Sequence, residues 1–294
     1  MNILLTGASG FIGQALQREL GQSHQLYLHF RRDPRPSEVH AGTPIRQVDD
    51  IPTALDAVVN LAGENLGAQR WTNSRKQALR DSRIAFTQKL SADLAAASQA
   101  PKVWINGSAV GIYGDAPGRN LDESSALGDD FAAQLCRDWE ATAEQAAAAL
   151  GAQRLVLLRL GVVLGPGGAL QKMLPPFRFG LGAVIGPGEQ HMPWISRDDV
   201  VQVIRRCLED EAFQGPLNLS APETASQRHF AKTLGQVLRR PVLFTAPAAL
   251  LKLMLGEMSS ILLVDQQVMP VALANSGYRF RHPDLASALE ASLS

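Results

Sequence analysis

The sequence predicts an α/β fold in which helices cover both faces of a parallel sheet. Apolar strand-like runs alternate with amphipathic helical segments from the first residues onward: residues 3–5 are predicted to form a strand and residues 11–20 a helix. Further strands are predicted at 26–30, 45–48, 56–61, 102–106 and 154–159, and long helices at 76–97 and 130–150. Strands that alternate with helices in this order form doubly wound sheets.

The composition of the chain changes near residue 165. Glycine and proline become dense through residue 187, and shorter helix and strand signals follow. We therefore expect residues 1–165 to form the main domain, with strand contributions from later segments. Residues 166–294 should form a smaller mixed lobe packed on the sheet, with 220–294 mostly helical.

The bulk composition is typical of a globular chain, because 46% of its 294 residues are hydrophobic and 19% are charged. The formal net charge is zero, which gives no electrostatic reason to expect nucleic acid or an anionic membrane as the main partner; a local basic patch is compatible with this total. The apolar stretch 241–264 contains proline, glycine and charged residues, which favours packed helix or a partner-binding surface over a membrane span.

Cysteine usage and the start of the chain indicate a cytoplasmic protein. Cys136 and Cys207 lie far apart and are predicted to be reduced, packed thiols. No cysteine–histidine cluster has the spacing of metal ligands, so we expect no bound metal. The first strand begins at once, and we therefore expect no signal peptide.

Three glycines follow the first strand at regular spacing. Gly7 permits a tight turn, Gly10 lets the backbone approach a pyrophosphate, and Gly13 lets the next helix pack close to the sheet. The start of that helix offers free N–H groups and the positive end of its dipole to phosphates. A glycine turn between a strand and a helix predicts a Rossmann-type dinucleotide site.

The end of the second strand indicates which dinucleotide is bound. NAD-binding proteins usually place an acidic residue there for the ribose hydroxyls. This chain instead has Arg31 and Arg32, whose guanidinium groups suit the 2′-phosphate of NADP(H). Asp33 follows directly and would reach a ribose if the strand ran longer, which keeps NAD as the alternative.

Three motifs at strand ends carry a resemblance to a known superfamily: the glycine turn, Asn60-Leu-Ala-Gly63, and Tyr113-Gly-Asp115. The chain resembles the extended short-chain dehydrogenase/reductases, which include the nucleotide-sugar epimerases. It is more similar still to an atypical epimerase-like branch with a C-terminal extension. The segments that match this branch are Arg70-Trp71, Ser82-Arg83, Gly161–Gly165, Pro193–Ile195 with Asp198-Asp199, and Gly256-Glu257 through Pro270.

The resemblance implies a cofactor site that spans several segments. Its adenine half is expected near Arg31 and Arg32, its nicotinamide half near Leu61, Ala62, Gly63, Gly161 and Val162, and Arg83 resembles a position that reaches the cofactor. Together with the glycine turn, this gives the predicted cofactor residues Gly7, Ser9, Gly10, Phe11, Ile12, Gly13, Arg31, Arg32, Leu61, Ala62, Gly63, Arg83, Gly161 and Val162.

The superfamily's usual catalytic tyrosine and lysine, four residues apart on one helix, are missing. Aligning Glu140 with the family's helical glutamate puts Ala132 at the tyrosine position and Cys136 at the lysine position. The serine position falls on Ala109, with Ser108 one residue away. No other Tyr-x-x-x-Lys occurs in the chain.

Other side chains are candidates for the chemistry. Tyr113 and Ser108 are predicted at the carboxyl edge of the sheet, where ligands bind in open α/β folds; the alternative for Tyr113 is local packing. Asp122 and Glu123 follow on a loop near the same edge. In the glycine- and proline-rich region, Arg178 would suit an anionic substrate group and Trp194 a stacked ring.

Two functions remain open. The first is an NADP(H)-dependent, epimerase-like oxidoreductase or isomerase for a small polar substrate. The second is a cofactor-binding regulatory protein without turnover, similar to proteins of this branch described as cell-division inhibitors. In either case the apolar region 250–264 offers a surface for a partner or for a second copy in a homodimer.

Overall fold

The computed structural model describes residues 1–294 and has a seven-stranded parallel sheet at its centre. The strand order is β11–β7–β5–β4–β1–β2–β3, and every neighbouring pair is parallel. The predicted doubly wound fold is confirmed. The strand order reverses between β1 and β4, and in open sheets of this kind ligands bind at the carboxyl ends of the strands beside such a reversal.

The seven strands of the sheet are mostly apolar, and those at its centre are buried on both faces, as parallel strands covered by helices require, whereas Thr43 and Pro44 at the edge are exposed. The strands are β1 (Asn2–Thr6), β2 (Gln25–His29), β3 (Thr43–Ile45), β4 (Ala57–Asn60), β5 (Val103–Ala109), β7 (Arg154–Leu160) and β11 (Gly215–Leu219). β3 lies earlier than the predicted 45–48. The Asp50 carboxylate accepts hydrogen bonds from the backbone N–H groups of Arg46 and Gln47, and the chain turns there into the short helix η2 (Val48–Asp50).

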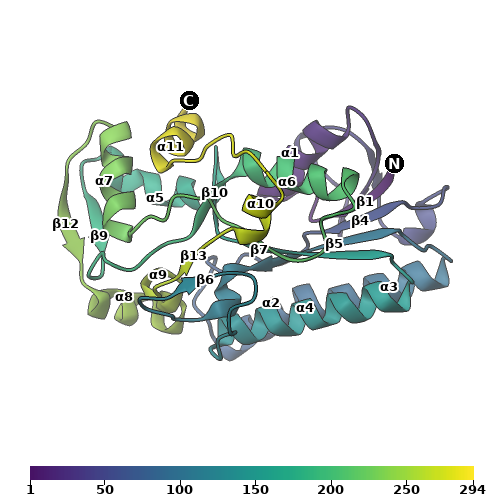
Figure 1. Ribbon diagram of the computed structural model, residues 1–294, viewed down its shortest axis with the longest axis horizontal. Helices are drawn as coiled ribbons and strands as arrows, with labels where there is room; N and C mark the ends of the chain where they lie inside the picture. The colour runs from purple at the N-terminus through teal and green to yellow at the C-terminus, as the bar shows by residue number, and fades with distance from the viewer.

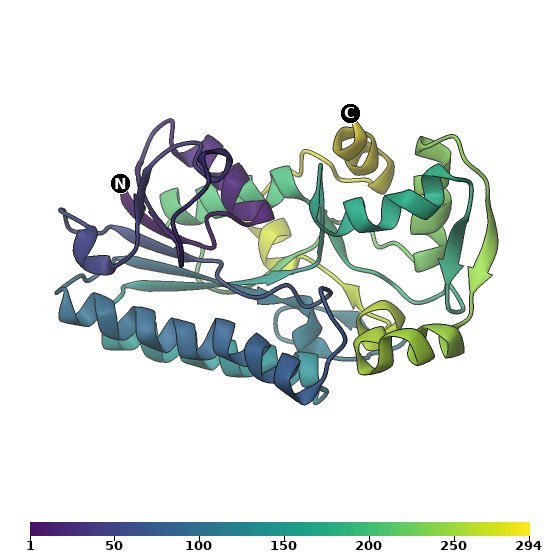
Figure 2. The same cartoon turned by 180° about the vertical axis from the view of Figure 1, so that it is seen from behind.

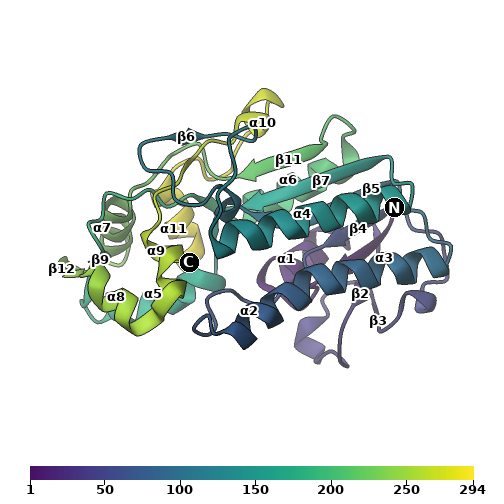
Figure 3. The same ribbon diagram turned by 90° about the horizontal axis from the view of Figure 1, so that it is seen from below.

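Helices cover the two faces of the sheet as separate layers (Figure 1). α1 (Phe11–Leu20) and α6 (Arg197–Glu209) lie on one face, and α3 (Phe86–Ala96) and α4 (Phe131–Ala149) on the other. Figure 3 shows α3 and α4 side by side beneath the sheet, with α2 (Asn73–Arg80) leading into α3. The consecutive elements α2, η3 (Asp81–Ala85) and α3 correspond to the predicted helix 76–97. The middle element, η3, is a π-helical segment. Such π-helical turns often occur at functional sites.

Alternating side chains of β1 explain how one strand serves both layers. Ile3 and Leu5 belong to the core beneath α1 and α6, whereas Leu4 belongs to the core on the α3 and α4 side. Successive residues of a strand point to opposite faces, so an uninterrupted apolar run fills both cores.

The smaller lobe lies at the end of the molecule remote from the N-terminus (Figure 2) and has a core of its own. After β8, the chain enters the lobe, returns to the sheet through α6 and β11, and then enters the lobe again. Its short strands pair as β8–β10, β9–β12 and β6–β13. None of the helices has the length and apolar character needed to cross a bilayer.

The remaining elements are η1 (Pro36–Glu38), η4 (Val110–Tyr113), β6 (Asn120–Leu121), β8 (Val162–Leu164), α5 (Gly168–Arg178), β9 (Gly182–Ile185), β10 (Trp194–Ser196), α7 (Gln227–Val237), β12 (Val242–Ala246), α8 (Ala248–Leu255), η5 (Gly256–Ser259), α9 (Ser260–Leu263), β13 (Gln267–Val268), α10 (Val271–Asn275) and α11 (Leu285–Leu293).

Substitution of Gly13 tests the close packing of α1 on the sheet. A Cβ at Gly13 would lie 2.3 Å from the Gly7 carbonyl oxygen and 2.8 Å from that of Ala8, and both are backbone atoms that cannot move away alone. We expect Gly13→Ala to lower the free energy of unfolding by about 1–3 kcal/mol, as overpacking does. The exposed Gly67, where a Cβ would make an ordinary 3.6 Å contact, provides the control Gly67→Ala. Equal urea midpoints for the two variants would contradict this account.

Candidate functional site

The glycine turn lies against the segment that follows β4, at the reversal of strand order. Gly7 has a φ of +68°, and a Cβ there would lie 2.6 Å from the Leu61 carbonyl oxygen. The Gly10 N–H donates to the Gly7 carbonyl oxygen at 2.9 Å, which closes the turn. Two predicted cofactor segments, far apart in sequence, are therefore in direct contact.

The N-terminus of α1 has no side-chain acceptor. No side chain caps this helix, its first turn carries no acidic residue, and Ser9 and Gly10 are exposed beside it. The helices α2, α4 and α6 are, in contrast, capped by Thr72, Asp130 and Ser196. The free N–H groups of Phe11 and Ile12, with the positive end of the helix dipole, suit a phosphate.

Leu61, Ala62 and Gly63 form the opposite side of the turn. The Ala62 N–H donates to Thr6 Oγ1 at 3.3 Å, which ties this segment to the end of β1. Leu61 and Ala62 are half-buried and Gly63 is exposed. A Cβ at Gly63 would lie 3.0 Å from the Arg83 Cζ, so the glycine makes room for that guanidinium.

Arg83 is a buried cation without a carboxylate partner. The residue is 8% exposed, and its guanidinium donates to the carbonyl oxygens of Glu64 (3.0 Å) and Leu79 (3.3 Å) and to Ser82 Oγ (3.3 Å). It also lies over the Trp139 ring, 5.1 Å from the ring centre. Burial lowers the pKa of Arg83 from its ordinary value. A buried charge held only by neutral oxygens retains a strong preference for an anion.

Arg31 and Arg32 lie at the end of β2 and differ in their partners. Arg32 makes a bidentate pair with Glu38 at 2.6 and 2.9 Å, and this pair lowers the pKa of Glu38 to about 2. Arg31 is exposed and makes a longer contact with Glu64, 3.5 Å between Nη2 and Oε1. Asp33, the residue that would favour NAD, pairs with Arg46 at 2.9 Å.

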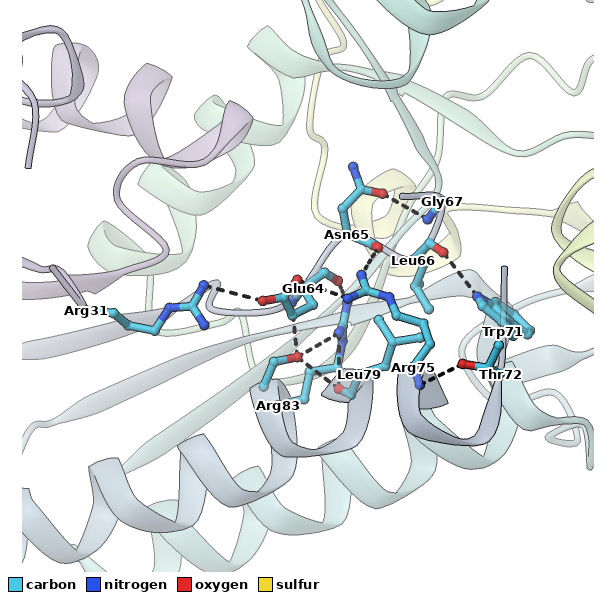
Figure 4. A network of polar contacts seen from close by, with 11 residues as sticks. Arg31, Glu64, Asn65, Leu66, Gly67, Trp71, Thr72, Arg75, Leu79 and Arg83 are labelled. Atoms are coloured by element: carbon cyan, nitrogen blue, oxygen red, sulfur yellow. Dashed lines mark hydrogen bonds and ion pairs between the residues drawn. The ribbon is translucent and has the colours of Figure 1, made fainter. Parts of the chain in front are cut away.

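Glu64 lies between two arginines from different elements (Figure 4). Its carboxylate contacts Arg75 at 3.2 Å and Arg31 at 3.5 Å, and the hydrogen bond from Arg75 together with the charge of Arg31 lowers the pKa of Glu64. Arg83 donates to the backbone oxygen of the same residue. Two guanidinium groups thus contact the carboxylate and a third contacts only the backbone, so the site has surplus positive charge.

Gly161 and Val162 follow β7 and are fixed by neighbouring strands. The Gly161 N–H donates to the Leu219 carbonyl oxygen at 3.0 Å, and the Val162 N–H donates to that of Pro193 at 2.8 Å. A Cβ at Gly161 would lie 2.9 Å from the Pro193 oxygen. Both residues are half-buried at the carboxyl edge of the sheet.

A buried polar chain joins three central strands at this edge. Thr6 Oγ1 donates to Asn60 Oδ1 at 2.7 Å, and Asn60 Nδ2 donates to Asn106 Oδ1 at 2.7 Å and to Thr87 Oγ1 at 2.9 Å. This chain was not among the features predicted from the sequence. Its signal was present, because Asn60 and Asn106 are polar residues within apolar strands buried on both faces, where an unpaired amide is costly.

A second buried chain contains both of the predicted catalytic residues. Ser108 Oγ donates to Glu140 Oε1 at 2.6 Å, and Glu140 makes a bidentate ion pair with Arg159 at 2.9 and 3.0 Å. Arg159 also donates to the Tyr113 hydroxyl at 3.0 Å, and that hydroxyl donates to Asn218 Oδ1 at 2.6 Å.

The protein itself occupies the hydrogen-bonding positions of Tyr113, which is 3% exposed. Burial raises the pKa of Tyr113, and the nearby Arg159 only partly offsets this. Burial by itself would lower the pKa of Arg159, but the hydrogen bonds and charge of Glu140 reverse this and raise it. The geometry supports the local-packing alternative for Tyr113 better than a proton-transfer role.

The helix positions of the missing catalytic pair lie on α4. Cys136 is buried, and burial raises the pKa of its thiol to about 12, so it carries no charge that could replace the lysine. The charge of Arg83 acts on this thiol, and its guanidinium lies over Trp139 of the same helix. A cation from η3 therefore lies over α4, the helix on which the family resemblance puts the missing lysine.

The other sequence candidates do not gather at one site. Trp194 is 1% exposed within the core of the lobe, so its ring faces are used in packing and it does not present a stacking surface. Arg178 is exposed at the last residue of α5. Asp122 accepts hydrogen bonds from Ser124 and Ser125 within its own turn, and the Glu123 carboxylate accepts from backbone N–H groups.

Comparison with known proteins assigns the chain to a family. The model of the NAD dependent epimerase/dehydratase family matches residues 3–219. The chain belongs to this family. A second model, a domain of unknown function (DUF1731), matches residues 246–292, where the family resemblance implied a C-terminal extension.

Relatives within the family match over nearly the whole chain. An epimerase family protein of Mycobacterium leprae is 40% identical over 292 residues, which cover 98% of this chain and 94% of the relative. The crystal structure of human epimerase family protein SDR39U1 with NADPH has a TM-score of 0.89 and 35% identity, and covers 99% of both chains. A nucleoside-diphosphate sugar epimerase from Corynebacterium glutamicum has a TM-score of 0.77 and 30% identity, over 100% of this chain and 59% of its own.

The buried ion pair between Glu140 and Arg159 predicts a large effect on stability. Glu140→Gln keeps the shape of the side chain but leaves Arg159 buried without a counter-charge. We expect the free energy of unfolding in urea to fall by about 3–5 kcal/mol. The exposed pair Lys89–Asp93 offers the control Lys89→Gln, which should cost less than about 1 kcal/mol. A Glu140→Gln variant as stable as the control would show that the pair contributes little.

Proposed function

We propose that this protein binds NADP(H) between the ends of β1 and β4 and acts as an epimerase-like oxidoreductase or isomerase on a small polar substrate. The observation that carries the proposal is the uncapped N-terminus of α1, held against Leu61 by a glycine turn that tolerates no Cβ. The human relative crystallised with NADPH supports the same cofactor. We assign nucleotide binding to residues 1–165 together with α6 and β11, and substrate binding to the lobe within 166–294.

Each segment of the site has a proposed role toward the cofactor. The turn Gly7, Ser9, Gly10, Phe11, Ile12 and Gly13 would hold the pyrophosphate through backbone N–H groups. Leu61, Ala62, Gly63, Gly161 and Val162 would contact the nicotinamide half. When bound, NADPH supplies a hydride donor, and the protein contributes orientation and electrostatics.

Arg31 is proposed as the principal reader of the 2′-phosphate. Glu38 neutralises Arg32 through a bidentate pair, whereas Arg31 has only the longer contact with Glu64 and is free to rearrange. Asp33 is paired with Arg46, which favours NADP(H) over NAD. Arg32 would contribute mainly to the electrostatic potential around the 2′-phosphate and would not bind it directly.

Arg83 is proposed to supply the positive charge that the family's lysine normally gives. Its guanidinium lies 5.1 Å from the centre of the Trp139 ring on α4, the helix on which Cys136 occupies the expected lysine position. Its guanidinium borders Gly63 and has no carboxylate partner. This arrangement suits hydrogen bonding to the nicotinamide ribose.

Ser108 and Tyr113 are proposed as positioning residues, because their hydroxyls are committed to Glu140, Arg159 and Asn218. The same observation favours the second candidate, a cofactor-binding regulatory protein without turnover.

The two functions are separated by incubating the protein with NADP⁺ or NADPH and a panel of nucleotide sugars. Cofactor absorbance at 340 nm and product chromatography detect turnover. Cofactor-dependent capture of a partner without turnover would favour the regulatory protein.

Fluorescence titration with NADPH and NADH tests the cofactor assignment. We expect Arg31→Ala to weaken NADPH binding by roughly 10–100-fold, the effect of losing charge-assisted hydrogen bonds, and to leave NADH binding nearly unchanged. Arg35→Ala, an exposed arginine in the same loop, is the matched control. Failure of the unmodified protein to bind either nucleotide would refute the proposed cofactor site.

Arg83→Met separates a cofactor role from a structural one. Because the charge is buried without a counter-ion, we expect the nucleotide-free variant to unfold at the same or a higher urea concentration. NADPH binding should nevertheless weaken by at least about tenfold, and Arg83→Lys should restore part of it. A variant that loses stability but binds NADPH normally would assign Arg83 to packing alone.

A further inference from the structure

Arg197 is the first residue of α6, and its side chain lies beside the start of α1. The Arg197 Cζ is 5.0 Å from the centre of the ring of Phe11, the first residue of α1. Gly165 leaves room for both side chains, because a Cβ there would lie 2.9 Å from the Phe11 ring and 3.1 Å from the Arg197 Cβ. The guanidinium is therefore next to the helix N-terminus that is proposed to hold the pyrophosphate.

The charge of Arg197 has no partner within the protein. The side chain is half-buried, its Nε is buried without a hydrogen bond, and no carboxylate lies within 4.0 Å of the guanidinium. Burial lowers the pKa of Arg197, and the charges of Asp198 and Arg18 act on it in opposite directions. A partly buried cation without a counter-ion retains a preference for an anion.

Three other arginines lie over aromatic rings, and the protein satisfies each of them. Arg159 and Arg206 pair with carboxylates, and Arg83 donates to carbonyl oxygens. Arg206 is on the same helix as Arg197, with its Cζ 5.8 Å from the centre of its ring. A ring contact alone is thus not how this protein usually holds a guanidinium group.

The position of Arg197 on α6 is also unfavourable for the helix itself. It is the first residue of a 13-residue helix, where the positive end of the helix dipole repels a cation. The acidic residues of the same turn, Asp198 and Asp199, are the kind that the dipole favours. A cation at this position stabilises neither the helix nor an ion pair, which points to a bound anion.

We infer that Arg197 binds the pyrophosphate of NADP(H), together with the backbone N–H groups of Phe11 and Ile12. The inference rests on the cofactor site proposed above. A guanidinium group donates paired hydrogen bonds to phosphate oxygens, and the Phe11 ring would hold its plane in place. The pyrophosphate would thus be contacted from both α1 and α6, whereas Arg31 would contact the 2′-phosphate.

Fluorescence titration with NADPH tests the inference. Arg197→Met keeps an apolar side chain over Phe11 and removes the charge. We expect this variant to bind NADPH about 10–100-fold more weakly, the effect of losing charge-assisted hydrogen bonds, and Arg197→Lys to restore part of the affinity. The nucleotide-free Arg197→Met variant should unfold at the same or a higher urea concentration, because an unpaired charge has been removed.

Adenosine 2′-monophosphate locates the contact on the cofactor, because it carries the 2′-phosphate but no pyrophosphate. Calorimetric titration should give the same affinity for this nucleotide in Arg197→Met as in the unmodified protein. Arg31→Ala should weaken its binding. The two arginines are thereby assigned to different phosphates of one cofactor.

Arg206→Met is the matched control, because Arg206 is on the same helix and over a ring but is neutralised by Asp210; NADPH affinity should not change. Equal NADPH affinity of Arg197→Met and the unmodified protein would overturn the inference and leave the cofactor site standing, the result expected if Arg197 binds a substrate phosphate instead. No NADPH binding by the unmodified protein would refute the site itself. A lower urea midpoint for Arg197→Met, or an equal loss of adenosine 2′-monophosphate binding, would overturn the inference by assigning Arg197 to packing.

Discussion

The buried ion pair between Glu140 and Arg159 joins helix α4 to strand β7, and the carboxyl edge of the sheet is organised around it. Ser108 extends the contact to β5, and Tyr113 and Asn218 extend it to η4 and β11. Removing two charges from water is costly, so such a pair persists only where further hydrogen bonds satisfy both groups. Here they do, and the positions of strand ends that are far apart in sequence are thereby fixed.

The cofactor site uses the edge that this pair organises. Its two sides, the glycine turn and the segment after β4, meet so closely that Gly7 admits no side chain. Around Glu64, positive charge exceeds negative charge, with Arg31 exposed, Arg75 paired and Arg83 buried without a carboxylate. A dianionic ribose phosphate and a pyrophosphate are the kind of ligand that would balance this excess. The same region therefore combines a backbone held in one position with positive charge that acidic side chains do not fully balance.

The lobe and the Rossmann domain are also joined outside the sheet. Lys76 makes an ion pair with Glu257, and Arg70 donates to the Leu253 carbonyl oxygen. These contacts hold η5 and the end of α8 against the loop and helix that follow the cofactor segment 61–63.

The sequence by itself determined the fold class, the glycine turn and the loss of the usual tyrosine and lysine. Strand periodicity and glycine spacing are local properties, and neighbouring residues impose them regardless of the rest of the chain. Local signals failed where long-range contacts or side-chain capping compete: Asp50 turns the chain after Ile45, so the third strand lies at Thr43–Ile45 and not at the predicted 45–48. Only the tertiary structure decided that Trp194 is a core residue, that Tyr113 is held by Arg159 and Asn218, and that Arg83 lies over Trp139. Burial and hydrogen-bond partners depend on segments more than a hundred residues apart, and spacing along the chain does not encode them.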